Sequence, residues 1–269
     1  MLQIPFYWLD VFTSEPFGGG PTVVCLVDKY IDDNVLSNIA KETGVLETAF
    51  VEEIGESEYN LRWFYSDGSE ATFAGYATLA ATHTLVEEYG VKSPITYHTL
   101  TEDWIGEVNN GKVTVLIPMR GDLTPTDDER ILEALNIKDY VEILFGEGFG
   151  NRVYCIVLET QDQVKDLEPD QCLIGKVLSE LEALAVIITA RAEEPYDFVY
   201  RLFVSSREDY ACGSGQGVLA PYWQAKLGKS KVRSRQPHER GSELEAEALK
   251  NGVKITSTAR ILIKGTLLT

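Results

Sequence analysis

Ten residues late in the chain combine two acids, a thiol, a hydroxyl and three glycines: Glu-Asp-Tyr-Ala-Cys-Gly-Ser-Gly-Gln-Gly at 208–217. An apolar run at 218–223 follows at once and predicts a helix. Glycines allow close backbone approach and left-handed turns. The free N–H groups at the start of a helix can receive a carboxylate or a phosphate. The stretch therefore predicts a site for a small anionic molecule, with an acid and a thiol beside it.

Each polar residue of this stretch allows a functional and a structural interpretation. Asp209 can be a proton-handling group or the cap of the turn. Cys212 stands at a predicted helix N-terminus, where the pKa of a thiol tends to fall, but a small buried cysteine is the commoner outcome. Gly213, Ser214 and Gly215 offer backbone N–H groups and a hydroxyl to an anion, or simply cap the helix.

A second acid opens an apolar stretch much earlier in the chain. Glu47 follows Gly-Val-Leu and precedes Thr-Ala-Phe-Val, a pattern that predicts a buried strand. A charged group seldom lies in such a strand without a partner or a chemical role. Desolvation raises the pKa of a carboxyl, which suits it to move a proton near neutral pH. The alternative is a strand-end acid paired with an arginine or a helix N-terminus.

The neighbourhood of the first stretch has a counterpart in the first half of the chain. Arg62-Trp-Phe-Tyr-Ser is repeated as Arg201-Leu-Phe-Val-Ser. Each copy is followed by a Gly-containing turn, by a Leu-Ala pair in an apolar segment, and by a glycine that can end a helix: 74–76, 79–80 and Gly90 in one half, 212–214, 219–220 and Gly228 in the other. Four features in the same order predict a duplicated unit whose two helix N-termini meet at one cleft.

Tyr76 holds the place in the first turn that Ser214 holds in the second. Its hydroxyl can hydrogen-bond a ligand, or its ring can pack in the core. The segment 75–89 is small or apolar on nearly every side, so we expect a helix enclosed by the rest of its unit.

The pattern of elements predicts an α+β fold of two pseudo-symmetric domains, each a curled, mostly antiparallel sheet or barrel around a central helix. We expect domains at 1–118, with central helix 75–89, and at 126–258, with central helix 215–227. A strand near 259–269 can join the first domain. The stretch 118–125, bounded by two prolines, is the expected boundary.

Composition limits the partners and the compartment. Twenty-four basic and 42 acidic residues give a formal charge of −18, which argues against nucleic acid and anionic membranes as partners. The four cysteines show no Cys-x-x-Cys, and no histidine lies near a cysteine, so no metal is expected. The N-terminus lacks the features of a signal peptide, and no apolar run reaches membrane-spanning length. A cytoplasmic location is therefore expected.

Five segments of the sequence resemble the phenazine-biosynthesis (PhzF-like) isomerase family of the diaminopimelate-epimerase-like superfamily. They are 10–24 (Asp-Val-Phe-Thr-Ser-Glu-Pro-Phe-Gly-Gly-Gly-Pro-Thr-Val-Val), 46–50 (Leu-Glu-Thr-Ala-Phe), 61–64 (Leu-Arg-Trp-Phe), 73–80 (Phe-Ala-Gly-Tyr-Ala-Thr-Leu-Ala) and 208–215. The resemblance implies two pseudo-symmetric halves that each wrap a central helix, in agreement with the duplication. It also suggests a homodimer.

The activity that the resemblance implies is a cofactor-free isomerisation. Glu47 matches the glutamate that moves a proton between carbons of a small carboxylated substrate at the cleft between the halves. Asp209 and Ser214 match residues that line this cleft. Related epimerases use one cysteine from each half, but here only the second half offers one, Cys212, while the first-half turn offers Ala74 or Gly75. A two-cysteine racemase is therefore not expected.

The chain departs from the family pattern at two positions that the resemblance places at the substrate. The family usually has Gly-His in the first turn, where this chain has Gly75-Tyr76, and Gly-Asn-Pro in the first loop, where it has Gly19-Gly20-Pro21. The first change removes a neutral-pH proton carrier, and the second removes a hydrogen-bonding amide. These changes favour a different substrate in specialised metabolism. The alternatives are a cyclase that needs no base, or a non-catalytic metabolite-binding protein.

Overall fold

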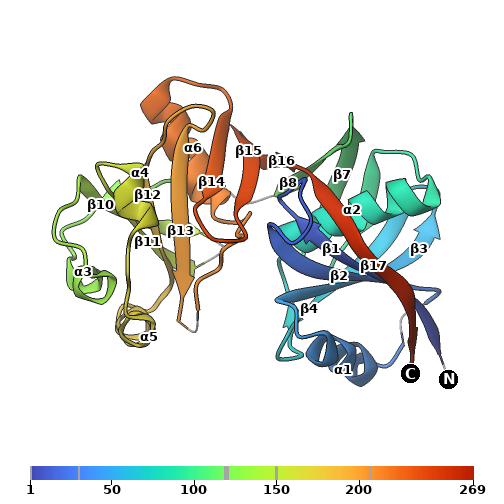
Figure 1. Cartoon of the computed structure of the whole chain (residues 1–269). Helices are drawn as coiled ribbons and strands as arrows, with labels where there is room; N and C mark the ends of the chain where they lie inside the picture. The colour runs from blue at the N-terminus through green and yellow to red at the C-terminus, as the bar shows by residue number, and fades with distance from the viewer. Residues whose placement is uncertain (1, 30, 118–120, 149–150, 206) are drawn as a thin grey trace. The chain divides into compact units, whose positions relative to one another are not determined.

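The computed structural model describes residues 2–29, 31–117, 121–148, 151–205 and 207–269. The chain divides into two compact units, Met1–Ile117 with Thr256–Thr269, and Pro118–Ile255 (Figure 1). The expected bounds, 1–118 and 126–258, differ from these units by a few residues. Residues 256–258 lie in the first unit, and the described residues 121–125 lie in the second, where a short strand at Thr124–Pro125 pairs with the next strand of that unit.

The first unit is a curved sheet of mixed direction. In chain order its elements are β1 (Gln3–Val11), β2 (Gly20–Val27), α1 (Asp33–Thr43), β3 (Glu47–Gly55), β4 (Glu58–Tyr65), β5 (Glu70–Ala71), α2 (Gly75–Tyr89), β6 (Ile95–His98), β7 (Asp103–Asn109), β8 (Lys112–Ile117) and, from the end of the chain, β17 (Ala259–Leu268). The strand order is β17-β1-β2-β3-β4-β6-β7-β8, with β5 also paired to β4. The β2–β3 and β4–β6 pairs are parallel and the others antiparallel. The expected final strand joins this unit, since β17 pairs with the whole length of β1.

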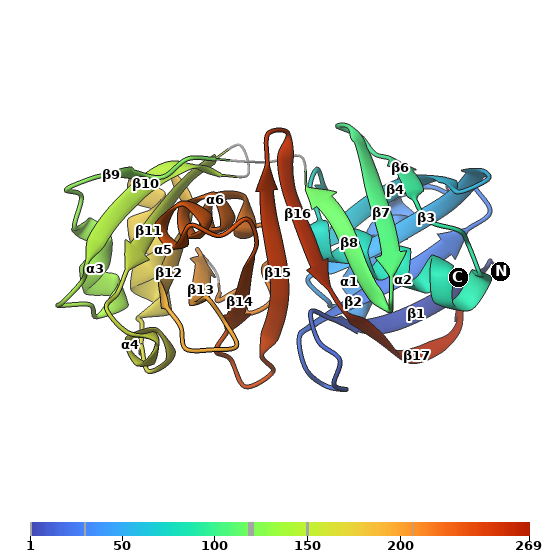
Figure 2. The ribbon, with the colours of Figure 1, turned by 90° about the horizontal axis from the view of Figure 1, so that it is seen from above.

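Helix α2 is enclosed by the first unit, as its composition predicted. It contacts β1, β2, β3, β7, β8 and β17, and the strands pass around it in both ribbon views (Figures 1 and 2). Its buried threonines are satisfied locally, because the hydroxyls of Thr78, Thr82 and Thr84 each donate to the carbonyl four residues earlier, at 2.8–2.9 Å. A threonine-rich helix can therefore be buried without unpaired hydroxyls.

The second unit repeats this plan. Its elements are β9 (Thr124–Pro125), α3 (Arg130–Leu135), β10 (Glu142–Gly148), β11 (Asn151–Val157), α4 (Gln161–Lys165), α5 (Gln171–Glu180), β12 (Ala183–Arg191), β13 (Phe198–Val204), α6 (Gln216–Leu227), β14 (Val232–Gln236) and β15 (Ser242–Leu249); β16 (Gly252–Ser257) runs across the boundary. From β10 to β15 the pairings run antiparallel, parallel, antiparallel, parallel, antiparallel. The same alternation runs from β1 through β2, β3, β4 and β6 to β7. In both units the central helix comes between the fourth and fifth strands of this series, which confirms the predicted α+β fold of two pseudo-symmetric halves.

Helix α6 begins at Gln216, one residue later than expected, with Gly215 as its N-cap. It contains Pro221, which has no N–H to donate to the carbonyl of Gly217. That carbonyl instead accepts the N–H of Gly121 at 3.0 Å, so the segment that enters the second unit satisfies it. The proline is accommodated because a neighbouring chain segment replaces the missing helical hydrogen bond.

A close approach of strand β7 to α2 depends on a glycine. A Cβ atom added to Gly106 of β7 would lie 2.2 Å from the Thr82 hydroxyl oxygen. We therefore expect Gly106→Ala to lower the free energy of unfolding by about 1–3 kcal/mol, as overpacking of a core does. Urea denaturation measures this. Gly265→Ala is the matched control, since Gly265 lies in β17 with no atom near the added Cβ; an equal loss in both variants would contradict the prediction.

Candidate active site

The turn before α6 forms a chain of three polar side chains. The Ser214 hydroxyl lies 3.1 Å from the Cys212 sulfur, and the thiol in turn hydrogen-bonds the carboxyl of Asp209. Asp209 Oδ1 also accepts the N–H of Ala211 at 3.2 Å. Cys212 is buried, while Asp209 and Ser214 are half-buried. A hydroxyl, a thiol and a carboxyl thus lie in hydrogen-bonding sequence on one turn.

Burial decides the protonation state of the Cys212 thiol in this turn. Desolvation raises the pKa of the Cys212 thiol well above its usual value, and the adjacent Asp209 carboxyl adds to this effect. The hydrogen bonds from Ser214 and Gly215 act in the opposite direction but are weaker. Burial therefore outweighs the tendency of a helix N-terminus to lower the pKa of this thiol, in agreement with the small buried cysteine considered the commoner outcome. Cys212 is a protonated thiol near neutral pH and acts as a hydrogen-bond donor.

The backbone of the same turn presents two N–H groups. Among the described residues, neither the N–H of Gly213 nor that of Ser214 donates to a protein acceptor. The N–H of Gly215, which was expected to face a ligand, contacts the Cys212 sulfur. The next two N–H groups, of Gln216 and Gly217, donate back to the carbonyls of residues 213 and 214. The available donors of this turn are thus the first two N–H groups.

A residue that the sequence analysis missed fixes this turn. Gln236, buried at the end of β14, donates from Nε2 to the carbonyl of Asp209 and accepts the N–H of Cys212 at Oε1, both at 2.7 Å. Ser242 donates to the same Oε1 at 3.1 Å, and Tyr200 donates to the carbonyl of Cys212 at 2.7 Å. Gln236 stands more than twenty residues from the turn in sequence, so only the tertiary fold reveals its role.

Glu47 is the first residue of β3 in the first unit. Only 8% of it is exposed, and the four residues that follow it in the strand are buried. Its carbonyl accepts the hydroxyl of Thr22 in β2 at 2.8 Å. Gly20, the first-loop position where the sequence departs from the family pattern that it resembles, opens the same strand two residues before Thr22.

The first-half turn lies at the N-terminus of α2. Gly75 is the first helical residue, and the preceding Ala74 provides no side-chain cap. Tyr76 is 5% exposed, and its ring packs edge-on against Phe12 with centroids 6.4 Å apart. The ring is therefore part of the core, in agreement with the packing alternative considered for it.

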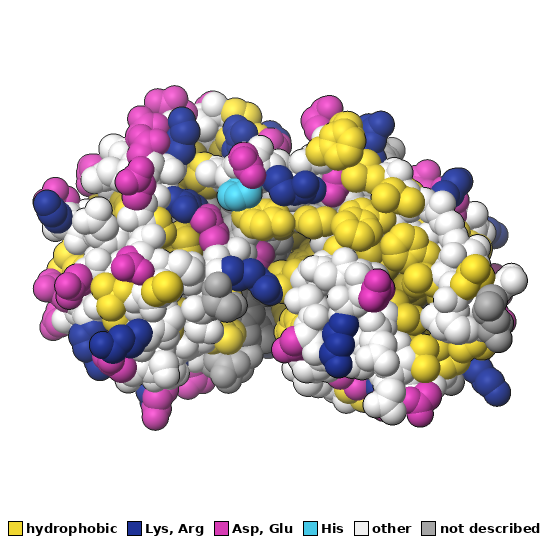
Figure 3. All heavy atoms as spheres, turned by 60° about the horizontal axis from the view of Figure 1, so that its bottom comes forward, with side chains coloured by type: hydrophobic (Ala, Val, Ile, Leu, Met, Phe, Trp, Pro, Cys, Tyr) yellow, Lys and Arg dark blue, Asp and Glu magenta, His cyan; other side chains and the backbone are white. Residues whose placement is uncertain are grey.

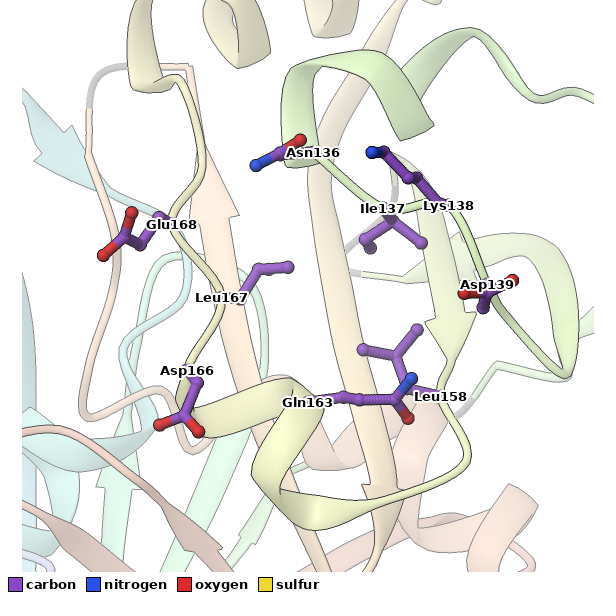
Figure 4. Close-up of a pocket in the computed structure, with 9 residues that line it drawn as sticks. All are labelled: Asn136, Ile137, Lys138, Asp139, Leu158, Gln163, Asp166, Leu167 and Glu168. Carbon is purple, nitrogen blue, oxygen red and sulfur yellow. The ribbon is translucent and has the colours of Figure 1, made fainter.

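Two surface hollows lie away from the predicted site residues. One of about 410 Å³ is in the second unit, where Ile137, Leu158 and Leu167 point toward one another among charged side chains (Figure 4). One of about 570 Å³ lies between α1 and the β1–β17 pair, in the unit over which hydrophobic side chains gather in Figure 3 (right). Among the described residues, no three histidine, cysteine or acidic side chains are placed to hold a metal ion. The described helices also include none that is both long and apolar enough to cross a membrane.

Comparison with known proteins decides the family. The model of the phenazine biosynthesis-like protein family matches residues 9–267. The chain belongs to this family. An uncharacterized isomerase of Pseudomonas aeruginosa is 31% identical over 99% of both chains, and an uncharacterized isomerase of Halalkalibacterium halodurans is 29% identical over all of both.

Solved structures agree with this assignment. The PhzF-family protein of Enterococcus faecalis superposes with a TM-score of 0.89 at 28% identity over the whole of both chains. A probable proline racemase of Agrobacterium radiobacter has a TM-score of 0.61 at 10% identity, covering 98% of this chain and 93% of its own, which shows a shared fold. Together these findings support a PhzF-like isomerase.

Gln236 offers a direct test of how the PhzF-like turn is held. Gln236→Met keeps the length of the side chain but leaves the Cys212 N–H and the Asp209 carbonyl without their partner. We expect a loss of about 1–3 kcal/mol in the free energy of unfolding, the cost of buried polar groups left unsatisfied. Urea denaturation measures it, with Gln3→Met as a control because Gln3 is exposed. A change within about 0.5 kcal/mol, usual for surface positions, would contradict the assigned role.

Asp209 predicts a pH dependence of stability. Desolvation raises the pKa of its carboxyl in the folded protein. Its contribution to stability is therefore fully present below the unfolded pKa of about 3.9 and is lost as pH rises through the folded value. We expect Asp209→Asn to melt at a higher temperature than the wild type at pH 7, with the difference shrinking toward pH 4.

The control is Asp67→Asn, because the pKa of Asp67 is shifted in the opposite direction. Asp67 is exposed, and hydrogen bonds from Ser69 lower the pKa of its carboxyl. Its contribution is present above the unfolded pKa and is lost as pH falls, so Asp67→Asn should give no gain at pH 7. A lower melting temperature for Asp209→Asn at pH 7 would show that burial does not dominate at this carboxyl.

Proposed function

We propose that this PhzF-like isomerase moves a proton between two carbons of a small carboxylated metabolite, without a cofactor, at a cleft that both units line. The observation that carries the proposal is the turn at 209–214. It presents two N–H groups and a hydroxyl at a helix N-terminus, beside a desolvated carboxyl. This combination suits a carboxylated substrate, because the helix end favours the anion and the neighbouring groups handle protons.

Glu47 is the proposed base. Its carboxylate takes a proton from a substrate carbon, and the C–H electron pair spreads into the conjugated carboxylate of the substrate. The Glu47 carboxyl exchanges its proton with solvent and returns one proton to a different carbon, so a double bond shifts and no atom is gained or lost. A buried position at a strand start suits this role, because desolvation makes a carboxylate a stronger base, which is then better able to take a proton from carbon.

The N–H groups of Gly213 and Ser214, with the Ser214 hydroxyl, hold the substrate carboxylate in this proposal. The N-terminus of α2 at Gly75 supplies the equivalent positive end from the first unit. Oriented donors that meet developing negative charge stabilise it without reorganisation. Asp209 holds or returns a proton, and Cys212 keeps its proton and orients Asp209.

A non-catalytic metabolite-binding protein is the second candidate. The observation that favours it is the burial of Tyr76 against Phe12, since this ring occupies the place where the family carries a histidine. A binder would keep the anion-holding turn and lose proton transfer. A third candidate is a cyclase that shapes a reactive intermediate without needing a base. Specialised metabolism is the proposed setting for all three.

Proton exchange with solvent separates these candidates. We expect the wild-type protein in heavy water to introduce deuterium into at least one member of a panel of small unsaturated carboxylic acids, followed by mass spectrometry. Glu47→Gln should slow this exchange by about 10²–10⁴-fold, the usual contribution of a general base. Glu53→Gln, an exposed acid on the same strand, is the control.

Equal exchange in the wild type and Glu47→Gln would remove the proposed base. Thermal stabilisation by an acid of the panel without any exchange would favour the binding protein.

A further inference from the structure

The two units share an arginine–glutamate pair with the same geometry. Arg62 of β4 donates from Nε and Nη2 to the two carboxylate oxygens of Glu70, at 2.6 and 2.7 Å. Arg201 of β13 donates in the same way to Glu208, at 2.8 and 2.7 Å. Each guanidinium also stacks over the phenylalanine two residues later, with 5.2 and 5.0 Å to the ring centroid. Bidentate pairs of this kind fix orientation as well as distance.

The remaining guanidinium nitrogen of each arginine reaches an outer helix. Arg62 Nη1 donates to Asp33, the first residue of α1, at 2.7 Å. Arg201 Nη1 donates to the carbonyl of Leu167, just after α4, at 2.7 Å. Each arginine therefore joins three segments: its own strand, an outer helix and the segment that carries the glutamate.

The glutamates lie at equivalent points of the chain. Glu70 pairs with Phe64 as Glu208 pairs with Phe203, so each folds the chain back onto the arginine's strand. Five residues after each glutamate comes the glycine of a candidate anion-holding turn, Gly75 in one unit and Gly213 in the other.

In the second unit the arginine–glutamate pair lies next to a candidate site residue. Asp209 directly follows Glu208, and its N–H donates to the carbonyl of Leu202 at 2.9 Å, next to Arg201. The side chains of Arg201 and Glu208 are only 13% and 19% exposed, so solvent competes weakly for their bonds.

We propose that Arg201 and Arg62 are positioning residues. Arg201 holds Asp209 and the turn at 213–214 in place through Glu208, and Arg62 holds the N-terminus of α2 through Glu70. The inference rests on the proposed function for its catalytic consequence. The mechanical part, that each arginine orders its own turn, is independent of any substrate.

Amide hydrogen exchange without substrate tests the mechanical part. Arg201→Lys keeps the charge but loses the bidentate fork. We expect exchange in peptide 208–215 to rise at least about tenfold, with peptide 70–76 unchanged. Arg62→Lys should give the reverse, so each variant is the control for the other. Arg152→Lys, in an exposed ion pair with Glu182, should change neither.

A paired substitution separates positioning from stability. Arg201→Met with Glu208→Met leaves no unpaired buried charge, so the fold should retain most of its stability. If Arg201 positions the turn, this double variant still shows faster exchange at 208–215. On an acid that the wild type deuterates, kcat should fall on the order of 10²-fold with a smaller change in KM.

Unchanged exchange at 208–215 in folded Arg201→Lys or in the double variant would overturn the proposal, as would an equal rise in both units. Failure of the proposed function has a different signature. In that case the wild type deuterates no acid of the panel, while the exchange differences between variants remain.

Discussion

The structure depends on burying two helices on nearly all sides and leaving their N-terminal ends as the places where backbone N–H groups meet other partners. A helix interior satisfies its own hydrogen bonds, so it can be enclosed by strands at no polar cost. In α6 the first N–H groups, of Gln216 and Gly217, donate to the carbonyls of the preceding turn, which leaves the N–H groups of Gly213 and Ser214 without a protein acceptor among the described residues. In both units the residue before the helix, Ala74 or Gly215, carries no capping side chain. The turn before α6 therefore presents N–H donors that a ligand can use.

Desolvation then sets the chemistry at these ends. The thiol of Cys212 keeps its proton because it is buried, and the carboxyl of Asp209 is less acidic for the same reason. Glu47 lies at a buried strand start in the other unit. Thus the groups that could carry charge are placed where charge is unfavourable, which is the condition under which acids and bases work near neutral pH.

The two units have the same arrangement of elements and differ in the side chains of the turn before the central helix. Strand directions, the enclosed helix and the arginine–glutamate pair are repeated. The chemistry is not, since the positions of Asp209 and Ser214 are taken by Ala71 and Tyr76 in the first unit. The two halves of the PhzF-like chain therefore share the elements that shape the turn, while only the second carries these polar side chains.

Much of the fold was predictable from local sequence. The segment 75–89 is small or apolar on nearly every side, which predicted an enclosed helix with the bounds observed. Helix α4 was missed, although Thr160 and Gln163 form a capping box, because five residues give too little periodicity to recognise. The domain bounds differ from the expected ones by a few residues, in part because the pairing of Pro125 with Leu144 is nonlocal.

The sequence by itself determined the duplication, the family, the two enclosed helices and the set of candidate residues, since each depends on local composition and spacing. Only the tertiary structure decided that Gln236 holds the turn, that Cys212 stays protonated, that Tyr76 packs in the core, and that Arg62 and Arg201 each join three segments. These properties depend on burial and on partners far apart in the chain. Residue spacing carries no direct record of either.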